Sequence, residues 1–495
     1  YFGFDVAVTP TGYKIIEVNV FPDYTKYLLR DGKTQEFLTE KVRQKFYRYR
    51  IDLPELYRTD GKAPSKGFKF TVVAPDETTA GQFARQTMGF KENVQLVVTG
   101  ECGALRERYP RNVAYAADRS AALQMAEGRY ILFADSGDAW PQNTLAKVWD
   151  FFEANGDKTD VVACRQRWTG GKTGWIKLDY KFAGGSGIAD IKERPDCIQT
   201  SLSSAFLRTE KAREHGFDAA LPVLGGSLLI NSLVLQKGTI GLLREPVCTR
   251  IFVDAPEHEA DASAMLEHYC GALFAQSERL HGRVERYAQY LAADELRTLT
   301  VSDNAPLCDR ARALLQRCDA HVLATARNCA FGTKAALLRL RDDGVTVRLD
   351  GEEAFAGDEA LGKLNAAGAL TVDGIETGSR YHITGHVLLP GFVTKPQIYL
   401  ADAETGKRLS DVPLTAAPEE KYRCLDGGYS YVRYEFAVAV REARLAALTR
   451  FELKTDTVPV KLSINLKKDS PLAALRRSGD LCVPKRTLLE KLKGK

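Results

Sequence analysis

The sequence lacks a long apolar run, a paired-cysteine motif and a strong charge of one sign. No stretch approaches the roughly 18 apolar residues that span a bilayer, so no transmembrane segment is expected. Ten cysteines are present without a CxxC pair or a repeated spacing, which argues against a zinc site and favours the reduced thiols of a cytosolic protein. The net charge of +5 is too small for a dedicated nucleic-acid-binding protein.

Low-complexity segments, internal repeats and a signal peptide are also lacking. The chain starts at Tyr1, directly inside what reads as a folded segment, so we expect a fragment of a longer protein. A length of 495 residues predicts two to four domains.

The first segment, residues 1–50, reads as two strands joined by a turn at Pro10 to Gly12, followed by a helix over "TQEFLTEKVRQKFYRY". Fifty residues with this pattern are too few for an independent domain. Residues 51–67 end in "GKAPSKG", which is typical of a linker.

Residues 68–255 alternate short apolar runs, such as "FKFTVVAP" and "YILFADS", with helical stretches predicted at 78–88 and 144–154. Such alternation indicates an α/β sheet with crossover helices. One apolar stripe at helical spacing identifies core residues of the second helix, with Trp149 packing there and not forming a ligand platform. The stripe consists of Leu145, Val148, Trp149 and Phe152.

Three further segments follow. Residues 256–345 read as mostly helical, and the histidines there (His258, His268 and His281) lack a ligand spacing, so they are interpreted as surface or packing residues. Residues 368–467 carry alternating strand patterns that predict a small β-sandwich. The basic tail at 468–495 favours a solvated segment, with an anionic membrane surface as the alternative partner.

The most informative short stretch is "YILFADSGDAW", residues 130–140, in which a strand runs into an acidic turn. Asp135 and Asp138 there can hold a metal ion against a phosphate. A structural interpretation competes, in which Asp138 or a neighbouring polar residue caps the next helix, Pro141 lies in its first turn and Gly137 permits a tight bend. This interpretation is the preferred one, since fold and activity are separable, and it requires no metal.

Several runs in this α/β segment, including "QTMGFKENVQLVV", "AEGRYILFADSGDAW", "IQTSLSSAFLR" and "LLINSLVLQKGTIGLL", occur in a characteristic order. In this respect the segment resembles the family 2 glycosyltransferase domain that heads many CDP-glycerol glycerophosphotransferases of teichoic-acid and capsule synthesis. The resemblance implies a Rossmann-like GT-A domain. It also implies a nucleotide-diphosphate sugar bound at the carboxyl ends of the strands, with Mn²⁺ or Mg²⁺ as cofactor and a surface polymer as acceptor.

Carried over residue by residue, the resemblance assigns donor binding to Asp76, Glu101 and Asp135 and metal binding to Asp135 and Asp138. Gly137 stands where the family has a metal-binding carboxylate. The Glu-Asp pair of the general base falls on Gly225 and Gly226, so no catalytic residue is assigned, although Glu101, Asp76 and Asp218 could replace it. These departures predict weak metal binding and a strongly reduced rate of sugar transfer.

A second resemblance concerns residues 1–50, where Asp5, Glu17 and Asn19 match the closing pattern of a sugar-transfer-associated ATP-grasp domain. It implies that Glu17 and Asn19 are the remnant of a Mg²⁺ site, since residues i and i+2 of a strand point to the same face. Alone, without the lobes that hold ATP, this remnant cannot act.

The sequence therefore predicts a family 2 glycosyltransferase-like protein of cell-surface glycopolymer synthesis whose activity is in doubt. The alternatives are a non-catalytic scaffold that binds a glycan or a partner within a multidomain protein, and a tether of an ATP-grasp ligase to the inner membrane surface.

Overall fold

The computed structural model describes residues 3–9, 12–19, 67–252, 261–297, 305–364, 370–376, 380–402, 405–424, 428–440, 450–454, 460–462 and 464–465. The predicted first-segment helix, most of the linker, His258 and the basic tail lie outside these ranges. The predicted N-terminal strand pair is confirmed as an antiparallel hairpin of β1 (Gly3–Thr9) and β2 (Gly12–Asn19). In the part that the structure describes, no helix is long and apolar enough to cross a membrane, and the nine cysteines there are free thiols.

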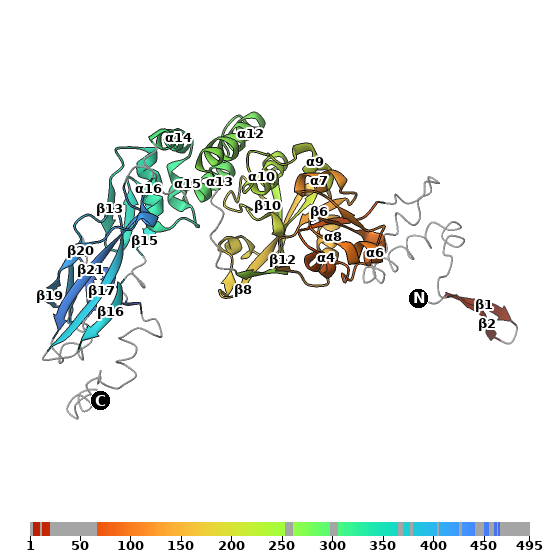
Figure 1. Ribbon diagram of the computed structural model, residues 1–495, viewed down its shortest axis with the longest axis horizontal. Coiled ribbons are helices and arrows are strands. Elements are labelled where there is room, and N and C mark those ends of the chain that lie inside the picture. The colour runs from red at the N-terminus through yellow and green to blue at the C-terminus, as the bar shows by residue number, and fades with distance from the viewer. Residues whose placement is uncertain are drawn as a thin grey trace, which may run out of the picture.

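The α/β segment forms one mixed sheet with the strand order β10-β12-β8-β11-β6-β3-β4-β5 (Figure 1). Two short strands, β7 and β9, pair with β12 and β8 outside this order. The strands are β3 (Phe70–Ala74), β4 (Val94–Val98), β5 (Val113–Tyr115), β6 (Tyr130–Phe133), β7 (Asp138–Ala139), β8 (Val161–Gly170), β9 (Gly174–Trp175), β10 (Gly187–Asp190), β11 (Ala205–Arg208) and β12 (Thr239–Phe252).

Helices cover both faces of this sheet. The helices of the segment are α4 (Glu77–Phe83), α5 (Phe90–Asn93), α6 (Gly103–Arg108), α7 (Arg119–Met125), α8 (Thr144–Asn155), α9 (Thr209–His215) and α10 (Gly225–Lys237), with short turns η1 (Gly156–Lys158), η2 (Lys177–Phe182) and η3 (Leu202–Ser204). Phe70 and Val72 of β3 pack with α4 and α8, whereas Val73 packs with α7 and α10. Burial on both faces explains why the parallel strands read as continuous apolar runs.

The predicted helix at 144–154 is confirmed as α8, and its apolar stripe is buried, with Trp149 in the core. The predicted helix at 78–88 ends earlier, at Phe83. Beyond that residue the chain hydrogen-bonds to the segment after the acidic turn. The backbone Thr87 N donates to Gln142 O at 2.9 Å, and the side-chain Nε2 of Gln86 donates to Pro141 O at 2.9 Å. A tertiary contact therefore ends this helix.

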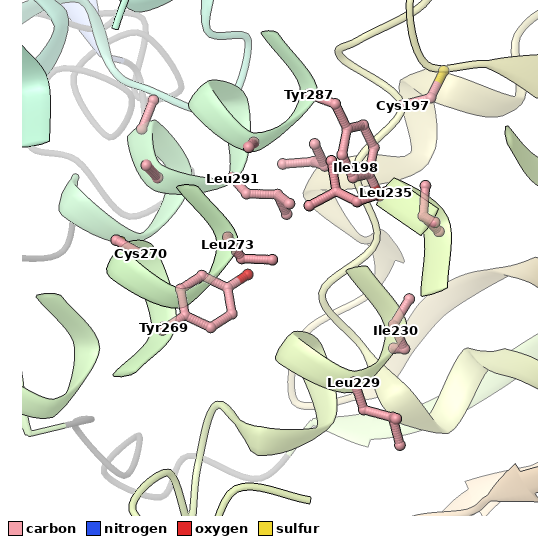
Figure 2. Close-up of a cluster of buried hydrophobic side chains, with 14 of the residues drawn as sticks. Cys197, Ile198, Leu229, Ile230, Leu235, Tyr269, Cys270, Leu273, Tyr287 and Leu291 are labelled. Atoms are coloured by element: carbon pink, nitrogen blue, oxygen red, sulfur yellow. The ribbon is translucent and has the colours of Figure 1, made fainter. Parts of the chain in front are cut away.

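The helical segment continues the same core. It contains α11 (Ala262–Ala264), the π-helical turn η4 (Met265–Gly271), α12 (Ala272–His281), α13 (Arg286–Leu296), α14 (Ala305–Leu315), α15 (Ala320–Thr325) and α16 (Phe331–Arg341). Figure 2 shows Leu229 and Ile230 of α10 in one apolar cluster with Tyr269 and Leu273. The hydrophobic core thus extends across the domain boundary predicted at residue 255.

The carboxyl-terminal part is β-rich, as predicted, and Figure 1 shows the helical segment between it and the large sheet. Two sheets of mostly antiparallel strands share one apolar core, with strand orders β20-β21-β17-β16-β24 and β19-β18-β22-β23. The prediction assigned no element between 346 and 367, where a three-stranded sheet forms from β13 (Val347–Asp350), β14 (Glu353–Ala356) and β15 (Glu359–Lys363). The two larger sheets consist of β16 (Leu370–Glu376), β17 (Tyr381–Pro390), β18 (Ile398–Ala401), β19 (Arg408–Val412), β20 (Leu414–Ala416), β21 (Tyr431–Val440), β22 (Arg450–Leu453), β23 (Val460–Leu462) and β24 (Ile464–Asn465), with the turn η5 (Glu420–Tyr422) before β21.

Candidate functional site

The candidate site lies where the strand order reverses. From β3 the chain moves outward to β4 and β5, and then returns to place β6 on the other side of β3. Parallel strands at such a switch point open a crevice at their carboxyl ends. Asp76 follows β3, Glu101 follows β4 and Asp135 follows β6, so all three stand at this edge.

Side-chain contacts bring part of this set together. Asp76 caps α4, accepting hydrogen bonds from Thr79 N at 2.7 Å and Thr79 Oγ1 at 3.0 Å, and it also bonds to Ser136 of the acidic turn. Burial acts to raise the pKa of Asp76, but these hydrogen bonds outweigh it and the net shift is downward. Glu101 is exposed in the neighbouring loop. Asp76 therefore joins the strand end of β3 to the acidic turn.

The acidic turn is closed by its own groups. Gly137 has φ +78°, a left-handed conformation that favours glycine, so the predicted tight bend is confirmed. Asp138 Oδ2 accepts a hydrogen bond from Asp135 N at 3.0 Å, and Asp138 then starts β7, which pairs with β12. The predicted helix-capping role of Asp138 or a neighbour is wrong, because α8 begins after Asn143 without a side-chain cap. Asp138 instead stabilises the turn.

Two arginines face the carboxylates of the turn. Arg250 on β12 is the register partner of Asp138, and its Nη2 lies 3.0 Å from Asp135 Oδ2 while its Nε lies 3.2 Å from Asp138 Oδ1. Arg119, at the start of α7, pairs with the other oxygen of Asp135. Two guanidinium groups therefore balance two carboxylates. Sequence reasoning missed both arginines, since neither is adjacent to the acidic turn in the chain.

Asp138 is held in an unusual state for an aspartate. Its side chain is 0% exposed, and Oδ1 has no hydrogen bond despite its proximity to Arg250. Burial raises the pKa of Asp138 from 3.8 to about 6, although the charge of Arg250 and the hydrogen bond from Asp135 N oppose the shift.

This shift predicts a pH-dependent stability. Because the folded pKa is raised, the folded chain keeps a proton between about pH 4 and 6 that the unfolded chain has released, and stability falls as pH rises through that window. Relative to the native chain, Asp138→Asn is expected to gain about 2 kcal/mol in free energy of unfolding between pH 4 and pH 7. Urea unfolding at both pH values measures this gain. The exposed Asp157→Asn is the control, and a difference from the native chain that does not change with pH would refute the assignment.

Gly225 and Gly226, where the resemblance places the general base, form the first turn of α10. A Cβ atom at Gly226 would lie 2.9 Å from Leu202 Cδ2 and 3.0 Å from Leu202 Cβ, so packing disfavours a side chain there. At Gly225 the nearest atom to such a Cβ would be Asp218 O at 3.5 Å, which is an ordinary contact. Asp218, an alternative base, is thus adjacent to α10.

A divalent cation such as Mn²⁺ or Mg²⁺ prefers several oxygen ligands. The described residues contain no group of three or more His, Cys, Asp or Glu that could hold a metal ion. Asp135 faces two guanidinium groups, and Asp138 is closed into the turn. The arrangement does not fit Mn²⁺ or Mg²⁺ without displacement of an arginine, and metal binding at Asp135 and Asp138 stays a prediction.

The fold and the edge together define an α/β domain of the Rossmann-like GT-A type, as predicted. Residues 105–216 match the family model described as glycosyl transferase family 2. Over 177 residues the chain is 30% identical to the minor teichoic acid biosynthesis protein GgaB of Bacillus subtilis (strain 168), covering 32% of this chain and 19% of GgaB. It is 26% identical over 180 residues to GgaA of the same organism, covering 32% of this chain and 40% of GgaA.

Solved structures with a similar fold include TarS of S. aureus, with 14% identity, a TM-score of 0.45 and coverage of 80% of this chain and 78% of TarS. A TarS 1–349 structure in complex with UDP-GlcNAc has 16% identity, a TM-score of 0.43 and coverage of 55% of this chain and 87% of that chain. The chain therefore contains a segment that matches family 2 glycosyltransferases and is similar to teichoic acid biosynthesis proteins. It spans less than half the length of either curated relative.

Proposed function

We propose that this chain transfers a sugar from a nucleotide-diphosphate donor to a cell-surface polymer of the teichoic-acid or capsule type. The observation that carries the proposal is the hydrogen bond from Ser136 of the acidic turn to Asp76 at the β3–β6 switch point, within a domain of this family. Asp76, Glu101 and Asp135 are proposed to contact the donor there.

The positive charges at the carboxyl ends of the strands support binding of the diphosphate group of the donor. Arg119 is 46% exposed and Arg250 is 26% exposed, so both guanidinium groups can be reached from solvent. Guanidinium groups form paired hydrogen bonds with phosphate oxygens, and a diphosphate can compete with Asp135 for them. Donor binding is therefore proposed to depend on the arginines more than on Mn²⁺ or Mg²⁺.

Calorimetry tests this function. We expect heat of binding for millimolar UDP-GlcNAc, or for another UDP- or CDP-linked sugar, with the chelator EDTA present and at most a few-fold strengthening by Mn²⁺. A strict requirement for Mn²⁺ would instead support the metal site at Asp135 and Asp138. Absence of heat for every donor, with Mn²⁺ present, would overturn the proposal.

A non-catalytic scaffold that binds a glycan or partner within a multidomain ATP-grasp/transferase protein is the second candidate. It is supported by the packing of Leu202 against Gly226, which disfavours a side chain at that position. Glycan-array binding without any donor binding would favour it.

Two further proposals concern the ends of the chain. The pair Glu17 and Asn19 is proposed to belong to an ATP-grasp Mg²⁺ site; in the β1–β2 register, Glu17 stands opposite Asp5. Mg²⁺-dependent ATP binding by a longer chain would test it. The basic tail is proposed to hold the protein peripherally at the inner membrane surface. Equal sedimentation with anionic liposomes, with and without residues 466–495, would remove that idea.

A further inference from the structure

The first turn of α10 carries no carboxylate, yet a carboxylate and an imidazole stand beside it. Asp218 lies in the loop before α10, and His268 lies on η4. Asp218 Oδ2 is 3.7 Å from His268 Nδ1. The two side chains are 35% and 44% exposed, so a substrate can reach them.

Asp218 is fixed against α10 by backbone contacts. Leu221 N donates to Asp218 O at 3.1 Å, and Gly225 N donates to Leu221 O at 2.8 Å. Asp218 Oδ1 also accepts a hydrogen bond from Ala220 N at 2.9 Å, which orients the carboxyl group and leaves Oδ2 toward His268. The carboxylate therefore has a defined place beside Gly225.

His268 is fixed by its helical turn. The next residue, Tyr269, is fully buried, and its hydroxyl lies 2.8 Å from Ser227 Oγ in the first turn of α10. Tyr269 also belongs to the apolar cluster that joins η4 to α10 (Figure 2). The π-helical turn places His268 outward at this junction, and π-helical turns recur at functional sites.

Two contacts connect this pair to the acidic turn. The ring of Phe217, the neighbour of Asp218, packs edge-on against Phe133 at 5.3 Å, and Phe133 ends β6 two residues before Asp135. On the other side, Leu202 contacts Gly226 while the adjacent Ser203 hydrogen-bonds to Asp138. The His268–Asp218 pair thus stands at the same end of the sheet as the donor edge.

We propose that His268 is the general base of the transfer reaction and that Asp218 is its positioning residue; this inference rests on the proposed function. His268 Nε2 takes the proton of the acceptor hydroxyl, while the Asp218 carboxylate, 3.7 Å from Nδ1, stabilises the imidazolium that forms. The acceptor oxygen forms a bond to the anomeric carbon as the bond from that carbon to the phosphate oxygen breaks. Its electron pair leaves with the nucleoside diphosphate, and the imidazolium later releases its proton to solvent.

Other charged groups lie near this turn. Glu267 of η4 lies 3.8 Å from Arg310 of α14, and both side chains are more than half exposed. Glu295 of α13 is half-buried, and its charge acts on Tyr269 and Cys270. The charges of these groups influence how the rate of transfer depends on pH, so the pH dependence must be compared between variants.

The test measures release of UDP from UDP-GlcNAc, with water or a polyol as acceptor, from pH 5 to 9. His268→Gln is expected to lower kcat by about 10²- to 10⁴-fold at unchanged donor KM and to abolish the loss of rate on the acidic side. Asp218→Asn is expected to give a smaller loss and to shift the acidic limb. The control is His321→Gln, since His321 is also an exposed histidine, 3.1 Å from a carboxylate oxygen of Glu359.

Each outcome of this experiment supports or overturns either the assignment of the base or the proposed function. If His268→Gln kept the native rate and the native loss of rate at acidic pH, the assignment of the base would be overturned and the proposed function would stand. Donor binding by the native chain without any UDP release would overturn the assignment as well. Absence of both binding and release would instead overturn the proposed function and this inference with it.

Discussion

Arg250→Gln is expected to lower the free energy of unfolding by about 3–5 kcal/mol at pH 8, as removal of one partner of a buried ion pair does. Asp138 is 0% exposed, and Arg250 is the cation that the structure places beside it. Without Arg250 the buried carboxylate has no counter-charge and must take up a proton to remain folded. The loss should therefore shrink at pH 5, where proton uptake costs less.

Urea unfolding of matched variants checks this expectation. Arg119→Gln is the control, because its ion pair with Asp135 is half-exposed and should contribute less than about 1 kcal/mol. Asp138→Asn in the Arg250→Gln background should recover most of the loss, because it removes the unpaired charge. Equal losses for Arg250→Gln and Arg119→Gln would show that the buried pair is not the stabilising contact. Under the proposed function, both variants should weaken donor binding.

Gly100→Ala is expected to lower the free energy of unfolding by about 3 kcal/mol and to weaken donor binding at least tenfold, since overpacking against backbone cannot be relieved by a rotamer change. A Cβ at Gly100 would stand 2.4 Å from Pro75 O. The loops after β3 and β4 must then separate, which moves Asp76 away from the Glu101 loop. Calorimetry and thermal unfolding measure the two effects.

Gly103→Ala is the matched control three residues away. A Cβ there meets no atom within 4 Å, and Gly103 is the first residue of α6, so alanine should be neutral or slightly stabilising. If Gly100→Ala retained native donor affinity despite lower stability, the contact between the two loops would be structural only, and Asp76 and Glu101 would not act on one donor.

Local patterns predicted much of the fold. Alternation of strands and helices at 68–255 predicted an α/β sheet with crossover helices, and β21 has the bounds of the predicted run "YVRYEFAVAV". The apolar stripe of α8 predicted its buried face. The three-stranded sheet at 347–363 was missed, because strands of four or five residues with mixed burial give a weak alternation signal.

The candidate site was predictable only in part. The positions of Asp76 and Asp135 follow from strand ends, which meet at one edge of a parallel sheet. The ion-pair partners of Asp135 cannot be predicted in this way, because Arg119 lies 16 residues before it and Arg250 lies 115 residues after it. The pairing of Asp218 with His268 likewise joins a loop to a helical segment that the sequence alone treated separately.

The sequence by itself determined that this chain holds an α/β domain with an acidic turn and a glycine bend, because hydrophobic periodicity and backbone conformation are local properties. Only the tertiary structure decided what that turn does. The register of β12 on β7 brings Arg250 to Asp138, and the packing of Leu202 disfavours a side chain at Gly226. Charge balance and side-chain room depend on groups far apart in the chain, so local sequence cannot specify them.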